Sequence, residues 1–253
     1  VHEFGQAPAA FAIALTVVFV LFLSLFPATF AWTVSRLRLF RSSASALLAI
    51  PALWVFLEWI RGWIFTGFPW LQIGYSQSDT PLSTAFAPLL GVLGVSWMLM
   101  LLALSIALLI AQRGCRSFAV ALVPAVILGS AAGLHFHEWS QPKGEPLKVS
   151  LIQGNIAQEN KWAEDWLVPT VLRYQDLTRE HWGDDLIVWP EAALPGLYES
   201  FRGPVFEPLA EEAREQGTDI ITGMLYQQDD GGIYNSVMSL GSTETFYFKR
   251  HLV

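Results

Sequence analysis

Two charged side chains stand where apolar strands are predicted to end. Glu191 follows the apolar run 186–189 and Pro190, and Lys249 closes the run 246–248. Functional groups in α/β sheets gather just beyond the carboxyl ends of strands, so Glu191 is a candidate general base. The apolar neighbours Trp189 and Leu194 predict a raised pKa for its carboxyl. The alternatives stay open: an ordinary loop glutamate, and a solvated lysine.

Strands and helices alternate in the part of the chain that carries these residues. The run 205–216 places Phe206, Leu209, Ala210 and Ala213 on one helical face, and Gly217 follows as a C-cap. This alternation predicts an α/β layered domain. The predicted strands are 149–153, 186–189, 219–222, 235–240 and 245–248, and the other predicted helix lies near 166–182.

The first half of the chain is far more apolar. Hydrophobic residues make up 53% of the sequence, and residues 1–134 carry only three acidic residues and six arginines. A bilayer explains this composition better than a large soluble core. The predicted membrane spans lie within 7–34, 44–63, 82–111 and 117–134. We therefore predict a transmembrane bundle over residues 1–140 and a separate domain over 147–253.

The arginines predict an orientation. Arg36, Arg38 and Arg41 follow the first span, and Arg113 and Arg116 follow the third. Positive charge favours the cytoplasmic side, so residues after the fourth span should lie on the outer face of the membrane, which in a bacterium is the periplasmic face of the inner membrane. Residues 148–253 carry seventeen acidic residues against eight basic ones, which argues against a nucleic-acid partner.

Other polar groups are weaker candidates for chemistry. Glu58 and Arg61 share a helix face, where a structural ion pair is favoured over a catalytic one. The uncharged aromatic loop 65–75 suits either a lipid entrance or an interfacial belt. His135, His137 and Glu138 have no further ligand cluster after them, so neither a metal site nor a cofactor is predicted.

Taken together, the motifs resemble those of the apolipoprotein N-acyltransferases, membrane-embedded members of the nitrilase superfamily. The order of the pieces is a strand ending in Gln153-Gly154-Asn155, a strand ending in Pro-Glu and a strand ending in lysine. The resemblance covers essentially the whole chain. Its motifs are Leu53-Trp54, Glu58, Arg61-Gly62-Trp63, Thr66-Gly67-Phe68-Pro69-Trp70-Leu71-Gln72, Gly74-Tyr75-Ser76-Gln77, Trp189-Pro190-Glu191 and Lys249-Arg250-His251-Leu252-Val253.

The resemblance implies a fold, a reaction and residue roles. The fold would be a membrane bundle followed by part of an αββα sandwich. The reaction would move a fatty acyl chain from a phospholipid donor, through a cysteine thioester, to the N-terminal amine of an apolipoprotein acceptor. Glu191 would be the general base, Lys249 would stabilise the oxyanion, and Trp162 would lie near the substrate entrance.

One part of the family pattern has no match. The nucleophilic cysteine of the family follows the lysine, whereas the single cysteine here, Cys115, lies in a linker predicted on the cytoplasmic side. We therefore predict a fragment that lacks upstream spans and the nucleophile, and that is inactive alone. The alternatives are a membrane-anchored nitrilase-type amidase or hydrolase, and a non-enzymatic membrane protein.

Overall fold

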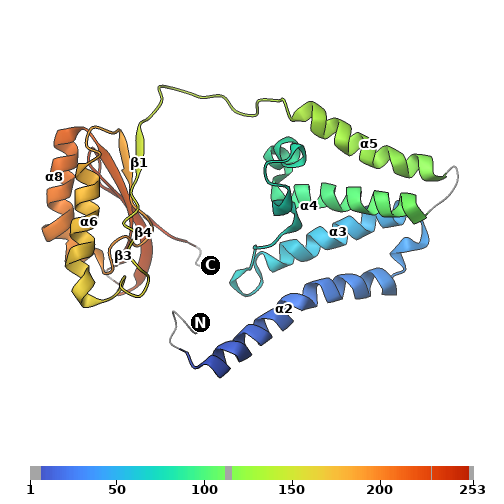
Figure 1. Cartoon of the computed structure of the whole chain (residues 1–253), viewed down its shortest axis with the longest axis horizontal. Helices are drawn as coiled ribbons and strands as arrows, with labels where there is room; N and C mark the ends of the chain where they lie inside the picture. The colour runs from blue at the N-terminus through green and yellow to red at the C-terminus, as the bar shows by residue number, and fades with distance from the viewer. Residues whose placement is uncertain (1–6, 112–115, 229, 251–253) are drawn as a thin grey trace. The chain divides into compact units, whose positions relative to one another are not determined.

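The computed structural model describes residues 7–111, 116–228 and 230–250. The predictions that concern Arg113 and Cys115 therefore lie outside the described residues, as do the motif residues His251, Leu252 and Val253. The chain separates into two compact units, one running over Ala7–Pro142 and the other comprising the residues from Lys143 onward (Figure 1).

The first unit is built from apolar helices that pack on their neighbours in chain order (Figure 1). Their bounds are α2 Ala9–Arg36, α3 Ser43–Arg61, α4 Pro81–Ala111 and α5 Arg116–Leu134. Among the described residues, α2, α3 and α4 are long and apolar enough to cross a bilayer. In α5 the corresponding apolar stretch, Val120–Leu134, is shorter. Three of the four predicted spans thus meet the length and composition of a membrane helix.

The third predicted span contains a break. Gly91 inside α4 has φ 65° and ψ −173°, which is not a helical conformation. Pro88 lies three residues before it and cannot donate a backbone hydrogen bond to the carbonyl of Thr84. The proline loosens the helix and the glycine takes up the bend, so α4 consists of two helical segments.

The second unit is a mixed five-stranded sheet in which the strands lie in chain order. β1, β2 and β3 are parallel to one another, whereas β4 is antiparallel to both β3 and β5. All five predicted strands are confirmed, and β3 extends further than predicted. The bounds are β1 Val149–Leu151, β2 Leu186–Val188, β3 Asp219–Gln227, β4 Ile233–Leu240 and β5 Thr245–Phe248.

Helices cover one face of this sheet. α6 (Leu167–Arg179) and α8 (Glu207–Gln216) lie side by side on it, with the short α7 (Tyr198–Phe201) between β2 and α8 in the chain (Figure 1). The predicted apolar face of α8 is buried against the sheet, and Gly217 caps the helix with φ 68°. The opposite face carries exposed apolar side chains, including Leu151 and Tyr247. The candidate site lies on this uncovered face.

Candidate active site

The sheet topology brings the two candidate residues, Glu191 and Lys249, to the same end of the sheet. β5 is antiparallel to β4, which is antiparallel to β3, so β5 runs in the direction of β2. The carboxyl ends of β2 and β5 therefore lie at the same end of the sheet. Lys249 Nζ lies 3.4 Å from Glu191 Oε1 there, an ion pair between residues 58 positions apart in sequence.

The strand that precedes Glu191 is anchored on the helix side of the sheet. Trp189 extends the β2–β3 ladder, with its N–H 2.8 Å from the Ile221 carbonyl. Its indole Nε1 donates to the buried Thr178 hydroxyl of α6 at 2.9 Å, and its ring packs on Tyr174 at 5.0 Å between centroids. Because of this anchoring, the indole points away from the uncovered face. Pro190 and Glu191 then follow at the carboxyl end of the strand.

A close approach between Glu191 and β3 depends on glycine. A Cβ on Gly223 would lie 2.8 Å from Glu191 Cα, closer than side-chain carbons come to other atoms, and 3.1 Å from Ala192 N, which is also a tight contact. Ala192 itself has φ 49°, so the chain turns sharply as it leaves Glu191. The loop after β2 is therefore seated directly on the middle of β3.

Asn235 connects the two charged residues. Its side-chain amide donates a hydrogen bond to Glu191 Oε1, and its backbone carbonyl accepts the N–H of Lys249 at 2.8 Å. Asn235 lies on β4 and pairs with Leu225 of β3. One residue thus orients the carboxylate through its side chain and sets the position of the lysine through its backbone.

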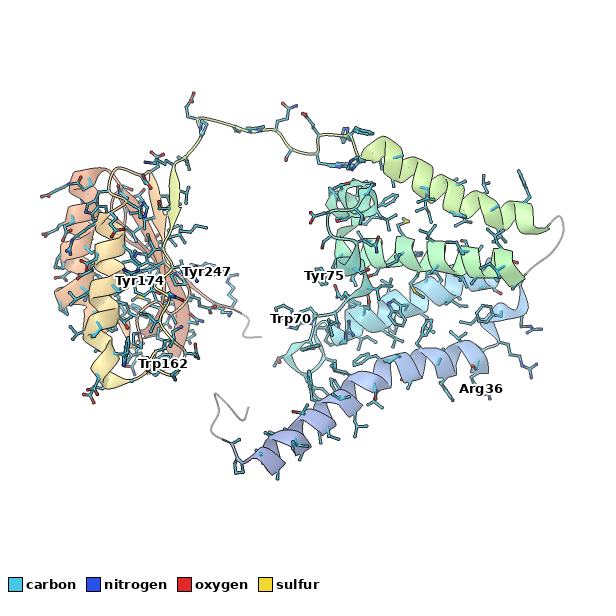
Figure 2. The ribbon with its side chains drawn as sticks, viewed as in Figure 1. Arg36, Trp70, Tyr75, Trp162, Tyr174 and Tyr247 are labelled. Carbon is cyan, nitrogen blue, oxygen red and sulfur yellow. The ribbon has the colours of Figure 1, made fainter. Side chains whose placement is uncertain are left out.

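These groups surround a hollow of about 330 Å³ on the uncovered face. That volume falls within the range of roughly 300–1,000 Å³ found for small-molecule sites. Figure 2 shows Tyr247, which lines the hollow, on the side of the sheet away from α6, whereas Tyr174 lies toward α6. The lining consists of Val188, Trp189, Glu191, Ile221, Gly223, Asn235, Ser236, Val237, Tyr247 and Lys249.

The expectation of a raised carboxyl pKa was wrong. The Asn235 hydrogen bond, followed by the charge of Lys249, lowers the pKa of Glu191 below its ordinary value. The side chain is 65% exposed, because the apolar neighbours Trp189 and Leu194 are buried on other sides of the loop. Glu191 is therefore ionised at neutral pH and able to accept a proton there.

The third predicted site residue is not in this hollow. Trp162 lies in a turn before α6, is 57% exposed and does not line the cavity (Figure 2). Sequence analysis also missed Asn235 and Gly223. One sequence signal was available for Asn235, because asparagine is disfavoured within strands and this one interrupts an apolar run.

Two family models match the chain. One, described as the apolipoprotein N-acyltransferase N-terminal domain, matches residues 1–105, and the other, the carbon-nitrogen hydrolase model, matches residues 148–253. The second range contains the whole five-stranded sheet, Glu191 and Lys249. Each family model therefore corresponds to a different unit of the structure.

Known relatives match along the whole chain. An apolipoprotein N-acyltransferase of Methylococcus capsulatus is 43% identical, over 100% of this chain and 50% of its own length. One from Vibrio cholerae is 39% identical, over 96% of this chain and 47% of its own. The chain thus spans about half the length of the curated relatives it matches. A crystal structure of an N-terminal amidase with a Gln-Gly peptide is 23% identical, covering 42% of this chain and 28% of its own, with a TM-score of 0.32.

Proposed function

Because this chain belongs to the apolipoprotein N-acyltransferase family, we propose that it is the part of such an enzyme that holds the general base and the oxyanion-stabilising lysine. The reaction transfers a fatty acyl chain from a phospholipid, through a cysteine thioester, to the N-terminal amine of a diacylglyceryl-cysteine apolipoprotein. The observation that carries this proposal is the 3.4 Å approach of Lys249 Nζ to Glu191 Oε1 in the hollow.

Each half-reaction uses the same two residues. Glu191 takes the proton of the cysteine thiol, and the thiolate attacks the ester carbonyl of the phospholipid. The oxyanion that forms is stabilised by the Lys249 ammonium. When the intermediate collapses, the lysophospholipid alkoxide leaves with the proton held by Glu191. In the second half-reaction Glu191 takes the proton of the incoming amine, and the cysteine sulfur leaves and is reprotonated.

The thiol in this scheme comes from outside residues 148–253, which contain no cysteine. Cys115 directly precedes Arg116 in the sequence and, in the proposed orientation, lies on the cytoplasmic side. The relatives are about twice as long as this chain, which leaves room for a nucleophile beyond it. We therefore propose that these 253 residues alone do not turn over phospholipid.

A transfer assay tests this function. The full-length protein, given phospholipid with a labelled acyl chain and a diacylglyceryl-cysteine peptide, should form labelled N-acyl peptide, and the 253-residue chain should form none. Release of labelled free fatty acid without N-acyl peptide would support a hydrolase instead. Turnover by the 253-residue chain that survives Cys115→Ser would overturn the proposed source of the thiol.

In the same assay, Trp162→Ala should raise the KM for the peptide, and an unchanged KM would remove Trp162 from the substrate path.

We further propose that residues 1–140 form a multi-pass bundle in a bacterial inner membrane and that residues 147–253 form a periplasmic nitrilase-like unit. The support is the three membrane-length helices and the arginines that follow α2. A Ser200→Cys change in a chain whose other cysteines are serine should react with a membrane-impermeant maleimide added from the periplasmic side. Labelling only after the inner membrane is opened would reverse the orientation.

The acid limb of the pH–rate profile tests the role of Asn235. Glu191 must be ionised to accept a proton, and its lowered pKa keeps it ionised as the pH falls through the ordinary carboxyl range. Asn235→Ala removes the hydrogen bond that stabilises the charged form, so the pKa rises and activity is lost at a higher pH than in the wild type. Asn235→Asp, which keeps the shape but adds a like charge, should shift the limb further. An unmoved limb in both variants would show that Asn235 does not tune Glu191.

A further inference from the structure

Helix α3 buries a carboxylate near its C-terminal end. The Glu58 residue is only 4% exposed. Its Oε1 accepts two hydrogen bonds, from the indole Nε1 of Trp54 at 2.9 Å and from the backbone N–H of Ile73 at 2.8 Å. A buried charge in a membrane helix is costly and is retained where it has a specific task. One such task is structural: through its hydrogen bond with the Ile73 N–H, Glu58 ties the loop after α3 to the helix.

The second oxygen of this carboxylate is not hydrogen-bonded in the same way. Glu58 Oε2 is buried without a hydrogen-bond partner, and so are Nε and Nη2 of Arg61, three residues further along the same helix. The direct ion pair expected from their spacing is not formed among the ion pairs of the described residues. Buried polar groups of this strength are nearly always satisfied, because leaving them unpaired costs free energy.

A small cavity has Glu58 and Arg61 in its wall. Its volume is about 30 Å³, and it is lined by residues of α2 and α3: Phe26, Pro27, Trp54, Leu57, Glu58 and Arg61. A cavity needs roughly 10–15 Å³ to admit one water molecule, and a buried water makes about three hydrogen bonds. Three unpaired atoms, one acceptor and two donors, belong to the two charged residues of its wall.

We propose that this cavity is a binding site for a single internal water molecule that bridges Glu58 Oε2 and the Arg61 guanidinium. The water donates to the carboxylate and accepts from Arg61, which satisfies both charged groups without direct contact between them. On the α2 side the cavity is lined by Phe26 and Pro27, so the water lies between α2 and α3.

The bridge matters because Glu58 also anchors the aromatic loop, residues 65–75. Next to the Ile73 contact, the Gly74 N–H donates to Ser96 Oγ of α4 at 2.9 Å. A Cβ at Gly74 would lie 2.4 Å from the Val92 carbonyl, so the loop is seated tightly between α3 and α4. On its outer side the loop exposes Phe65, Trp70, Leu71 and Tyr75. A Glu58 held in place by the water and Arg61 thus fixes the position of an exposed apolar surface.

A high-resolution map of the full-length protein in lipid nanodiscs tests the site directly. The proposal expects one solvent peak within about 2.7–3.2 Å of both Glu58 Oε2 and an Arg61 nitrogen. A direct Glu58–Arg61 bond, a cavity without density, or density larger than a single water would each overturn it. This outcome does not depend on the acyltransferase proposal, because the readout involves no catalysis.

Hydrogen exchange of the loop amides tests the anchoring role. Glu58→Ala should speed exchange of the Ile73 amide on the order of tenfold or more, since it loses a charged acceptor. Glu58→Gln retains an acceptor oxygen and should restore most of the protection. Ser96→Ala is the matched control, because it frees the neighbouring Gly74 N–H and leaves the carboxylate untouched. Equal exchange at Ile73 in wild type and Glu58→Ala would overturn the anchor.

Discussion

Glu191→Gln in the full-length protein is expected to lower the rate of acyl transfer by roughly 10²–10⁴-fold, the usual contribution of a positioned general base. Glutamine keeps the size of the side chain and an oxygen that accepts the Asn235 hydrogen bond. It has no basic oxygen, so neither the thiol nor the incoming amine can lose its proton to it. Both half-reactions should therefore slow, with little change in folding.

The measurement is kcat/KM for both substrates, accompanied by thermal unfolding. Glu215→Gln is the matched control, because it makes the same chemical change on the exposed surface of α8. Normal stability with strongly reduced kcat/KM in Glu191→Gln alone is the expected result. A Glu191→Gln enzyme within a few-fold of the wild type would remove Glu191 from the reaction.

Lys249→Met should lower kcat by roughly 10²–10³-fold, the loss found when an oxyanion-stabilising donor is removed from other enzymes. Methionine preserves the apolar stem of the lysine but has no charge to place beside a developing oxyanion. The variant also removes a charge that lowers the pKa of Glu191. The acid limb of its pH–rate profile should therefore move to higher pH, in the direction expected for Asn235→Ala.

The two effects of Lys249→Met separate in one experiment. At a pH well above the acid limb Glu191 is ionised in both proteins, so the remaining loss of kcat reports oxyanion stabilisation alone. Lys143→Met, which removes an exposed lysine from the linker between the units, should match the wild type. Full recovery of the Lys249→Met rate at high pH would show that the lysine acts only through Glu191.

The elements that position the site were predictable because their residue patterns are strong. The run 186–189 is apolar throughout and ends at Pro190, and the helix that ends at Gly217 has a clear apolar face. The placement of Glu191 and Lys249 at strand ends followed from the same patterns. That Glu191 and Lys249 lie at the same end of the sheet could not be predicted from the residues around each of them. It depends on two antiparallel pairings, β3 with β4 and β4 with β5.

Details set by register and side-chain direction were not predictable. The lowered pKa of Glu191 comes from Asn235, 44 residues away, whose side chain faces the carboxylate only in the observed register of β4. The apolar neighbour Trp189 turns its indole toward Thr178 instead of toward Glu191. The sequence pattern identified which residues lie near the carboxylate but not which of them contact it.

In the membrane half, too, the sequence pattern predicted the elements but not the contacts between their residues. Apolar run lengths predicted α2, α3 and α4, but not the break at Gly91. Spacing placed Glu58 and Arg61 on one helix face and suggested an ion pair. The carboxylate instead accepts from Trp54 and from Ile73, and the second of these contacts depends on how a loop 15 residues away folds back.

Intact-mass spectrometry of the full-length protein after incubation with phospholipid tests the central claim most directly. We expect a mass increase of one acyl chain, removed by hydroxylamine as a thioester and formed far more slowly in Glu191→Gln. An absent adduct, an adduct stable to hydroxylamine, or equal formation rates in wild type and Glu191→Gln would contradict the proposal that Glu191 and Lys249 serve a cysteine nucleophile.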